Sequence, residues 1–170
     1  MKRLATNGIF IALALILSWL ERFIPIELII PVPGIKLGLA NIVTIVALIL
    51  LDVKSAVIIT VLRCVLANML FGTPMSMIIA LSGAILALSV MTVLKTGYNR
   101  TFSVTGISAG GAAAHNIGQL AAASLMMKST AVFYYLPFLL LASMLTGFVT
   151  GIVAQSIIHR LETFQMKTNF

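Results

Sequence analysis

Long apolar runs, almost free of charged residues, follow one another along most of this chain. Apolar residues make up 61% of its 170 residues and charged residues only 9%, against roughly 25% charged in an ordinary soluble domain. A soluble globule cannot bury this much apolar surface, so we expect an integral membrane protein. The alternating pattern of membrane strands is absent from the sequence, which makes the predicted fold class all-α.

Six segments are candidates to cross a bilayer core of about 30 Å, which needs about 20 helical residues. The predicted helices cover about residues 4–23, 37–51, 55–71, 75–94, 103–127 and 131–161. The second is short, and the fifth is interrupted by Gly, His, Asn and Gln residues. We therefore predict one transmembrane domain over residues 1–170, a six-helix bundle. The segment 24–36 is proline-rich yet apolar, and we expect a hydrophobic loop on the bundle or an interfacial linker.

The basic residues give this bundle an orientation. Seven would lie on one side (Lys2, Arg3, Lys54, Lys95, Arg100, Arg160 and Lys167) and three on the other (Arg22, Lys36 and Lys128). Because cytoplasmic loops carry the excess of Lys and Arg, both termini are predicted to be cytoplasmic, in a multi-pass protein of the cell membrane. The same rule accounts for the net charge of +7 without nucleic-acid binding.

Arg63 is the residue that most strongly departs from this apolar pattern. It lies near the middle of the predicted third helix, where a charge costs roughly 2.5–3.5 kcal/mol, so it should face the bundle interior or a cavity. Ala56, Thr60 and Ala67 share its helical face. Its guanidinium could bind an anionic or carbonyl-bearing ligand as a planar fork. The alternative is a structural arginine that hydrogen-bonds to carbonyls of neighbouring helices.

Other polar residues fall between the middle and the outer end of the predicted spans. They are Asn41, Asn68, His115, Asn116 and Gln119. With Arg63 they predict a polar, substrate-binding pocket that opens outward. The alternative is a set of hydrogen bonds between helices, worth about 0.6 kcal/mol each on average. Neither a cofactor nor a metal site is predicted, because His115 has no second histidine nearby and the single cysteine offers one thiol.

Several motifs resemble a known family. The family called Gx transporter, also known as heptaprenyl diphosphate synthase component I, has a hallmark that resembles residues 33–44 (PGIKLGLANIVT). Residues 62–63 (LR), 70–72 (LFG), 114–119 (AHNIGQ) and 134–137 (YYLP) also match. The resemblance covers nearly the whole chain. The family itself is similar to the substrate-binding S components of energy-coupling factor (ECF) transporters.

This resemblance implies a six-helix membrane protein that captures a vitamin-like compound from outside. It also implies partners, a transmembrane coupling protein and ATPase subunits. Docking would use small residues on the first helix, here Gly8 and Ala12, where the usual pair is two alanines. The loop after the first helix would cap the ligand, which makes Lys36 a candidate contact.

No enzyme activity is predicted, although one name of the family contains the word synthase. Trans-prenyl synthases hold Mg²⁺ on two aspartate-rich motifs, whereas this chain has one aspartate, Asp52, and no carboxylate pair spaced to share a metal. It also has no Walker A motif, so ATP-driven transport would need a partner. Two alternatives remain open. One is a non-catalytic accessory protein of isoprenoid or quinone metabolism. The other is a stand-alone secondary carrier, which is expected to have an inverted repeat or a buried carboxylate for proton coupling.

Overall fold

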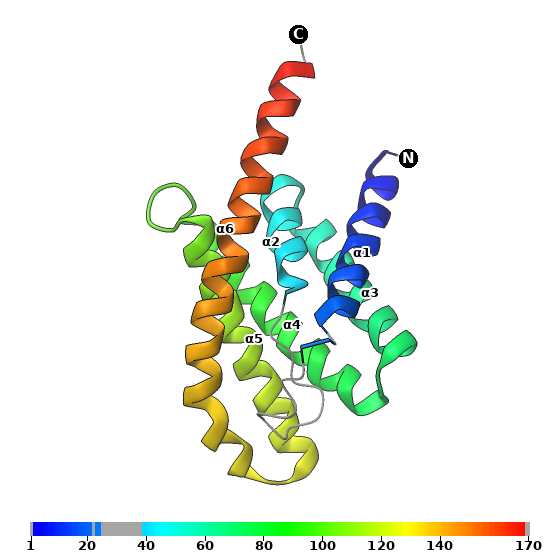
Figure 1. Cartoon of the computed structure of the whole chain (residues 1–170), viewed down its shortest axis with the longest axis vertical. Helices are drawn as coiled ribbons and strands as arrows, with labels where there is room; N and C mark the ends of the chain where they lie inside the picture. Colours follow the sequence, from blue (N-terminus) through cyan, green and yellow to red (C-terminus); the bar gives the residue numbers. More distant parts are fainter. Residues whose placement is uncertain (1, 22, 25–38, 169–170) are drawn as a thin grey trace.

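Helices make up the regular structure of this chain, as the fold class predicted from the sequence requires. The computed structural model describes residues 2–21, 23–24 and 39–168. The helices are α1 (Lys2–Glu21), α2 (Asn41–Leu50), α3 (Val53–Phe71), α4 (Pro74–Lys95), α5 (Val104–Met127), the short 3₁₀ helix η2 (Thr130–Tyr135) and α6 (Leu136–Thr168). Within this part of the chain no strand forms, and the only bridge joins Tyr98 and Phe102. Both termini lie at the same end of the bundle (Figure 1).

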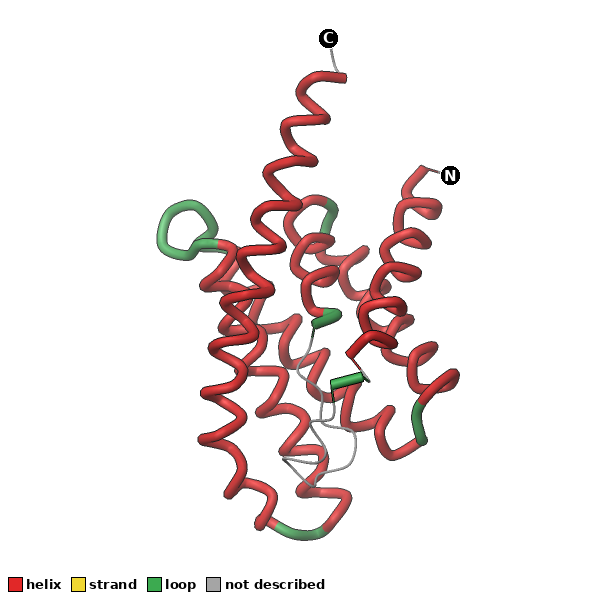
Figure 2. The backbone as a smooth tube through the Cα atoms, in the orientation of Figure 1, coloured by secondary structure: helices red, strands yellow, loops and turns green. Residues whose placement is uncertain are grey.

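Polar residues at the short connections start three of the helices. Asp52 precedes α3 and accepts a hydrogen bond from the backbone N–H of Ser55 at 2.6 Å. Thr73 and Ser76 form a reciprocal capping box at the start of α4, and Ser103 caps α5. Such caps satisfy backbone N–H groups that have no partner within the helix. They explain why these three helices begin within two residues of the predicted bounds (Figure 2).

In the described part of the chain, four helical segments are long and apolar enough to cross a membrane, namely α1, α3, α4 and Thr130–Thr163, which holds η2 and most of α6. The chain is therefore a membrane protein with several apolar helices. The two remaining helices differ from these. α2 has 10 residues, which rise roughly 15 Å, about half a bilayer core. α5 has 24 residues but is less apolar, since it contains His115, Asn116 and Gln119. The six-span count stays a prediction.

The structure corrects three predicted helix bounds, and one of them is the end of the last helix, which continues from the predicted residue 161 to Thr168. Residues 131–161 were expected to form one helix, but Thr130–Tyr135 forms a 3₁₀ turn and α6 begins only at Leu136. Pro137 then lies in the first turn of α6, where a missing N–H has no cost. The second helix was expected from residue 37, but Leu39 and Ala40 form a turn and α2 begins at Asn41.

Glycines bring α4, α5 and α6 into close contact. A Cβ added at Gly118 of α5 would come within 2.9 Å of the Cα of Gly83 on α4. A Cβ at Gly151 of α6 would lie 2.6 Å from the Cα of Thr105 on α5. Membrane helices associate through such close backbone approach. α5 therefore lies between α4 and α6 and anchors the bundle.

α1 lies at the edge of this bundle. It packs on α3 and, over a smaller area, on α2. Of the four apolar helices it has the smallest buried share. Its inward stripe consists of Ala14, Ser18 and Glu21, which are all buried. α1 is thus held along one seam, mainly by α3 (Figure 1).

Candidate functional site

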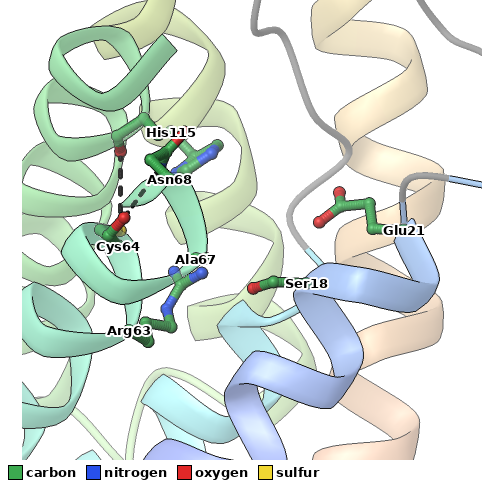
Figure 3. Close-up of a pocket in the computed structure, with 8 residues that line it drawn as sticks. Ser18, Glu21, Arg63, Cys64, Ala67, Asn68 and His115 are labelled. Carbon is green, nitrogen blue, oxygen red and sulfur yellow. Dashed lines mark hydrogen bonds between the residues drawn. The ribbon is translucent and has the colours of Figure 1, made fainter. Parts of the chain in front are cut away.

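A small polar cavity lies where α1 meets α3. Its volume is about 20 Å³, which is room for a water molecule rather than for a metabolite. Four helices line it through Ser18, Glu21, Arg63, Cys64, Ala67, Asn68, Ala80 and His115 (Figure 3). A metabolite-sized ligand would need α1 or the lining side chains to move apart.

Arg63 is the buried cation of this cavity. It is 6% exposed, and Ala56, Thr60 and Ala67 on the same face of α3 are buried with it, as the helical spacing predicts. Its Nη2 donates to Oδ1 of Asn41 at 2.9 Å. Its Nε has no hydrogen-bond partner, and among the described residues no carboxylate lies within ion-pair distance. The guanidinium therefore keeps donor capacity that these residues do not use.

Asn41 connects α2 to this arginine. It is the first residue of α2, and its Nδ2 is buried with no hydrogen-bond partner in the described part of the chain. One turn further along α2, Thr44 exchanges a buried hydrogen bond of 3.1 Å with Thr60 of α3. The α2–α3 interface is thus polar on the side that leads to Arg63.

Asn68 lines the cavity, but both ends of its amide are engaged. Nδ2 donates to the backbone carbonyl of Cys64 at 2.8 Å, and Oδ1 accepts from Oγ of Ser76 at 2.9 Å. Sγ of Cys64 lies 4.0 Å from the carbonyl oxygen of Ala80 on α4. These contacts tie α3 to α4 along one wall of the cavity (Figure 3).

The three predicted site residues of α5 have different surroundings. His115 is buried and lines the cavity. Gln119 is fully buried and packs against Gly83 of α4. Asn116 points to the other neighbour of α5, since its Nδ2 donates to the carbonyl of Leu139 on α6 at 3.1 Å. Of the predicted site residues, Arg63, Asn68 and His115 meet at the cavity and Asn41 joins them through Arg63. Lys36 lies outside the described residues.

Ser18 and Glu21 of α1 were not among the predicted site residues. Glu21 is only 5% exposed, and its Oε1 accepts a hydrogen bond from the backbone N–H of Leu39 at 3.4 Å. This contact joins the end of α1 to the turn before α2. The signal in the sequence was the spacing of Ala14, Ser18 and Glu21, which places small and polar residues on one face of an otherwise apolar helix.

Gly8 and Ala12, the predicted docking residues, lie on the exposed side of α1. A Cβ added at Gly8 would meet no atom within 4 Å. They thus face away from the bundle, whereas Ser18 and Glu21 of the same helix face the cavity. As for metals, no group of three or more His, Cys, Asp and Glu residues within residues 2–21, 23–24 and 39–168 could hold an ion.

The family expected from the motifs is also found by comparison. The family model described as heptaprenyl diphosphate synthase component I matches residues 10–157, which is most of the chain. Neither a curated protein nor a solved structure matches. The name of this family refers to one component of a synthase.

Proposed function

The chain belongs to the heptaprenyl diphosphate synthase component I family, and on this premise we propose that it is a membrane-embedded substrate-binding component. It captures a small metabolite from outside the cell for ATP-driven uptake, in the manner of an ECF S component. Its partners are then a transmembrane coupling protein and ATPase subunits. Both termini are cytoplasmic in this proposal, and all six helices lie in the cell membrane.

The observation that carries this proposal is the buried Arg63 at a polar cavity. A charge at this depth costs roughly 2.5–3.5 kcal/mol, and Asn41 is its one hydrogen-bonded side chain among the described residues. A ligand with an anionic group or a polarised carbonyl would supply the missing partner for Nε. Such a contact would account for an arginine at this buried position, where an apolar side chain would cost less free energy.

The exposed face of α1, on the side away from the bundle, supports the proposed docking of a coupling protein. Small residues let helices approach closely, and Gly8 and Ala12 lie on an exposed face that the bundle does not use. The chain contains no Walker A motif, so energy for uptake has to come from a docked partner. A coupling protein at this face would supply it.

A second candidate function follows from the family description, which names a synthase component. In that case the chain is a non-catalytic membrane partner of an isoprenoid synthase. The sequence contains no aspartate-rich Mg²⁺ motif, so the catalytic site would belong to another subunit.

Affinity purification from native membranes tests both candidates. We expect the tagged chain to retain a coupling protein and ATPase subunits, identified by mass spectrometry. Ala12→Leu should abolish this retention because the larger side chain holds the partner helix away. Val93→Leu, at an exposed site on α4, is the matched control and should retain them. Recovery of a prenyl synthase subunit in place of ATPases would favour the accessory role and contradict transport.

A further inference from the structure

The cavity between α1 and α3 has a polar group on each of these two helices. Arg63 enters it from α3, and Ser18 enters it from α1. Both residues are buried. In Figure 3 the hydroxyl of Ser18 points toward Arg63. Among the described residues, Asn41 is the one side chain to which the guanidinium donates. Ser18 therefore faces this cation without a direct hydrogen bond to it.

We infer that the cavity is a binding site for a single water molecule, which accepts from Nε of Arg63 and donates to Oγ of Ser18. Nε is buried and has no hydrogen-bond partner among the described residues, and a serine hydroxyl can accept as well as donate. Water suits this pair because it also does both, whereas a metal cation would be repelled by the guanidinium. The site goes beyond the proposed function, because it belongs to the protein without a ligand.

The volume of the cavity sets the size of its occupant. It is about 20 Å³, and a cavity needs roughly 10–15 Å³ to hold one water molecule. A second water molecule would need roughly the same volume again. The cavity thus holds one water molecule with little space left, and it is too small for a metabolite.

The buried charge of Arg63 gives a reason to keep this water. A cation inside an apolar bundle is costly unless its N–H groups have partners. Buried water molecules typically make about three hydrogen bonds to polar groups that would otherwise have none. A water at Nε would satisfy the donor that Asn41 leaves without a partner. The polar lining is essential to this argument, because a cavity with only apolar walls stays dry.

The water site also sets a condition for the proposed ligand. A group that displaces an ordered water loses affinity if it cannot reproduce the hydrogen bonds of that water. A ligand at Arg63 would therefore need an oxygen that accepts from Nε and lies within reach of the Ser18 hydroxyl. This condition rests on the proposed function, whereas the water site itself does not.

Nuclear magnetic resonance of the purified, ligand-free protein with ¹⁵N-labelled arginine tests the site. Arg63→Lys identifies the Nε–H signal of Arg63, which is the signal that this variant lacks. We expect a rotating-frame Overhauser cross-peak between this proton and water, with the sign of a bound molecule rather than of chemical exchange. Ser18→Val should abolish the cross-peak, because the methyl groups fill the space and the hydroxyl is lost. Ser89→Val, at an exposed site on α4, is the matched control and should retain it.

Replacement of chloride by gluconate in the buffer tests the competing occupant, a halide ion. We expect the ¹⁵N shift of Arg63 Nε to stay the same, and a changed shift would assign the cavity to a halide and overturn the inference. Absence of the water cross-peak in the parent protein, or its persistence in Ser18→Val, would overturn it as well. The two measurements on the parent protein decide the question even if Ser18→Val fails to fold. Neither needs a ligand or a partner protein, so the water site can stand while transport fails, and transport can stand while the water site fails.

Discussion

Arg63 illustrates what a sequence can predict about a single residue. Its burial followed from its position in an apolar helix, and its small, buried neighbours followed from helical spacing. The direction of Asn116 toward α6 did not, because spacing along α5 does not fix how that helix is rotated between its two neighbours. Glu21 was missed because a charged residue at the end of a span normally reaches water, whereas here it turns into the cavity.

Replacement of Arg63 by Lys tests whether its fork binds the ligand. An ammonium cannot reproduce the planar donors, so ligand affinity should fall by about 1.5–3 kcal/mol, roughly 10- to 150-fold. Ligand affinity and melting temperature should be measured on one preparation. Arg160→Lys, at an exposed site, is the matched control. Normal affinity with a lowered melting temperature would show that Arg63 is structural.

Asp52 predicts an effect of pH on stability. The hydrogen bonds from the backbone N–H and the hydroxyl of Ser55 hold the pKa of Asp52 below its ordinary value of 3.8, and Arg3 adds a smaller attraction. Because the pKa is lower in the folded state, the stabilisation is present above pH 3.8 and is lost as the pH falls through the folded pKa.

The measurement is the melting temperature of the detergent-solubilised protein between neutral pH and pH 3. We expect Asp52→Asn to lose part of the difference in melting temperature that the parent protein shows over this range. An identical acid dependence in both proteins would mean that the α3 cap does not contribute to it.

At the scale of the elements, sequence signals predicted helix starts where a cap marks them. Asp52, Thr73 and Ser103 are such marks, and α3, α4 and α5 follow them closely. Ser129 caps the turn Thr130–Tyr135 in the same way, and the predicted start at residue 131 lies next to it. The change from 3₁₀ to α-helix at Leu136 carries no such signal, because the residues on both sides of it are apolar. The start of α2 was misplaced for the same reason, since the apolar run continues through Leu39 and Ala40.

Gly151 tests the contact between α5 and α6. Gly151→Ala places a methyl group 2.6 Å from the Cα of Thr105, and because backbone cannot yield as a side chain can, overpacking of this kind costs about 1–3 kcal/mol. The melting temperature should therefore fall. Gly8→Ala is the matched control, since it has open space around it and gains helix propensity. Equal melting temperatures for the two variants would contradict the close contact.

At the scale of the whole molecule, the chain begins and ends at the same end of the bundle. Both termini lie there in Figure 1, and the six crossings that we propose would place them on the same side of the membrane. Composition predicted a membrane protein because apolarity is a property of the entire chain. The number of crossings is harder to derive, since α2 is short and α5 is polar for a span. Their neighbours, rather than their own sequences, make them part of the bundle.

The proposed orientation can be checked with reporter tags. Tags at Lys54, at Gly97 and after Phe170 should be cytoplasmic, while tags near Gly72 and Lys128 should be external, because the basic residues concentrate at the first set of positions. Accessibility to an impermeant reagent in intact cells distinguishes the two sides. An external C-terminus would contradict six crossings.

The polarity of α5 also bears on how the chain is inserted during synthesis. Insertion depends on the apolarity of each emerging segment, and α5 is the long helix that falls short of its neighbours in this respect. As the proposed fifth span, α5 would gain its stability in lipid from the close backbone contacts with α4 and α6. When synthesis has reached Met127, α4 has already been made but α6 has not. At that stage α5 has one of its two partners, so its insertion as the proposed fifth span has to wait until α6 is made or rely on an assisting factor in the membrane.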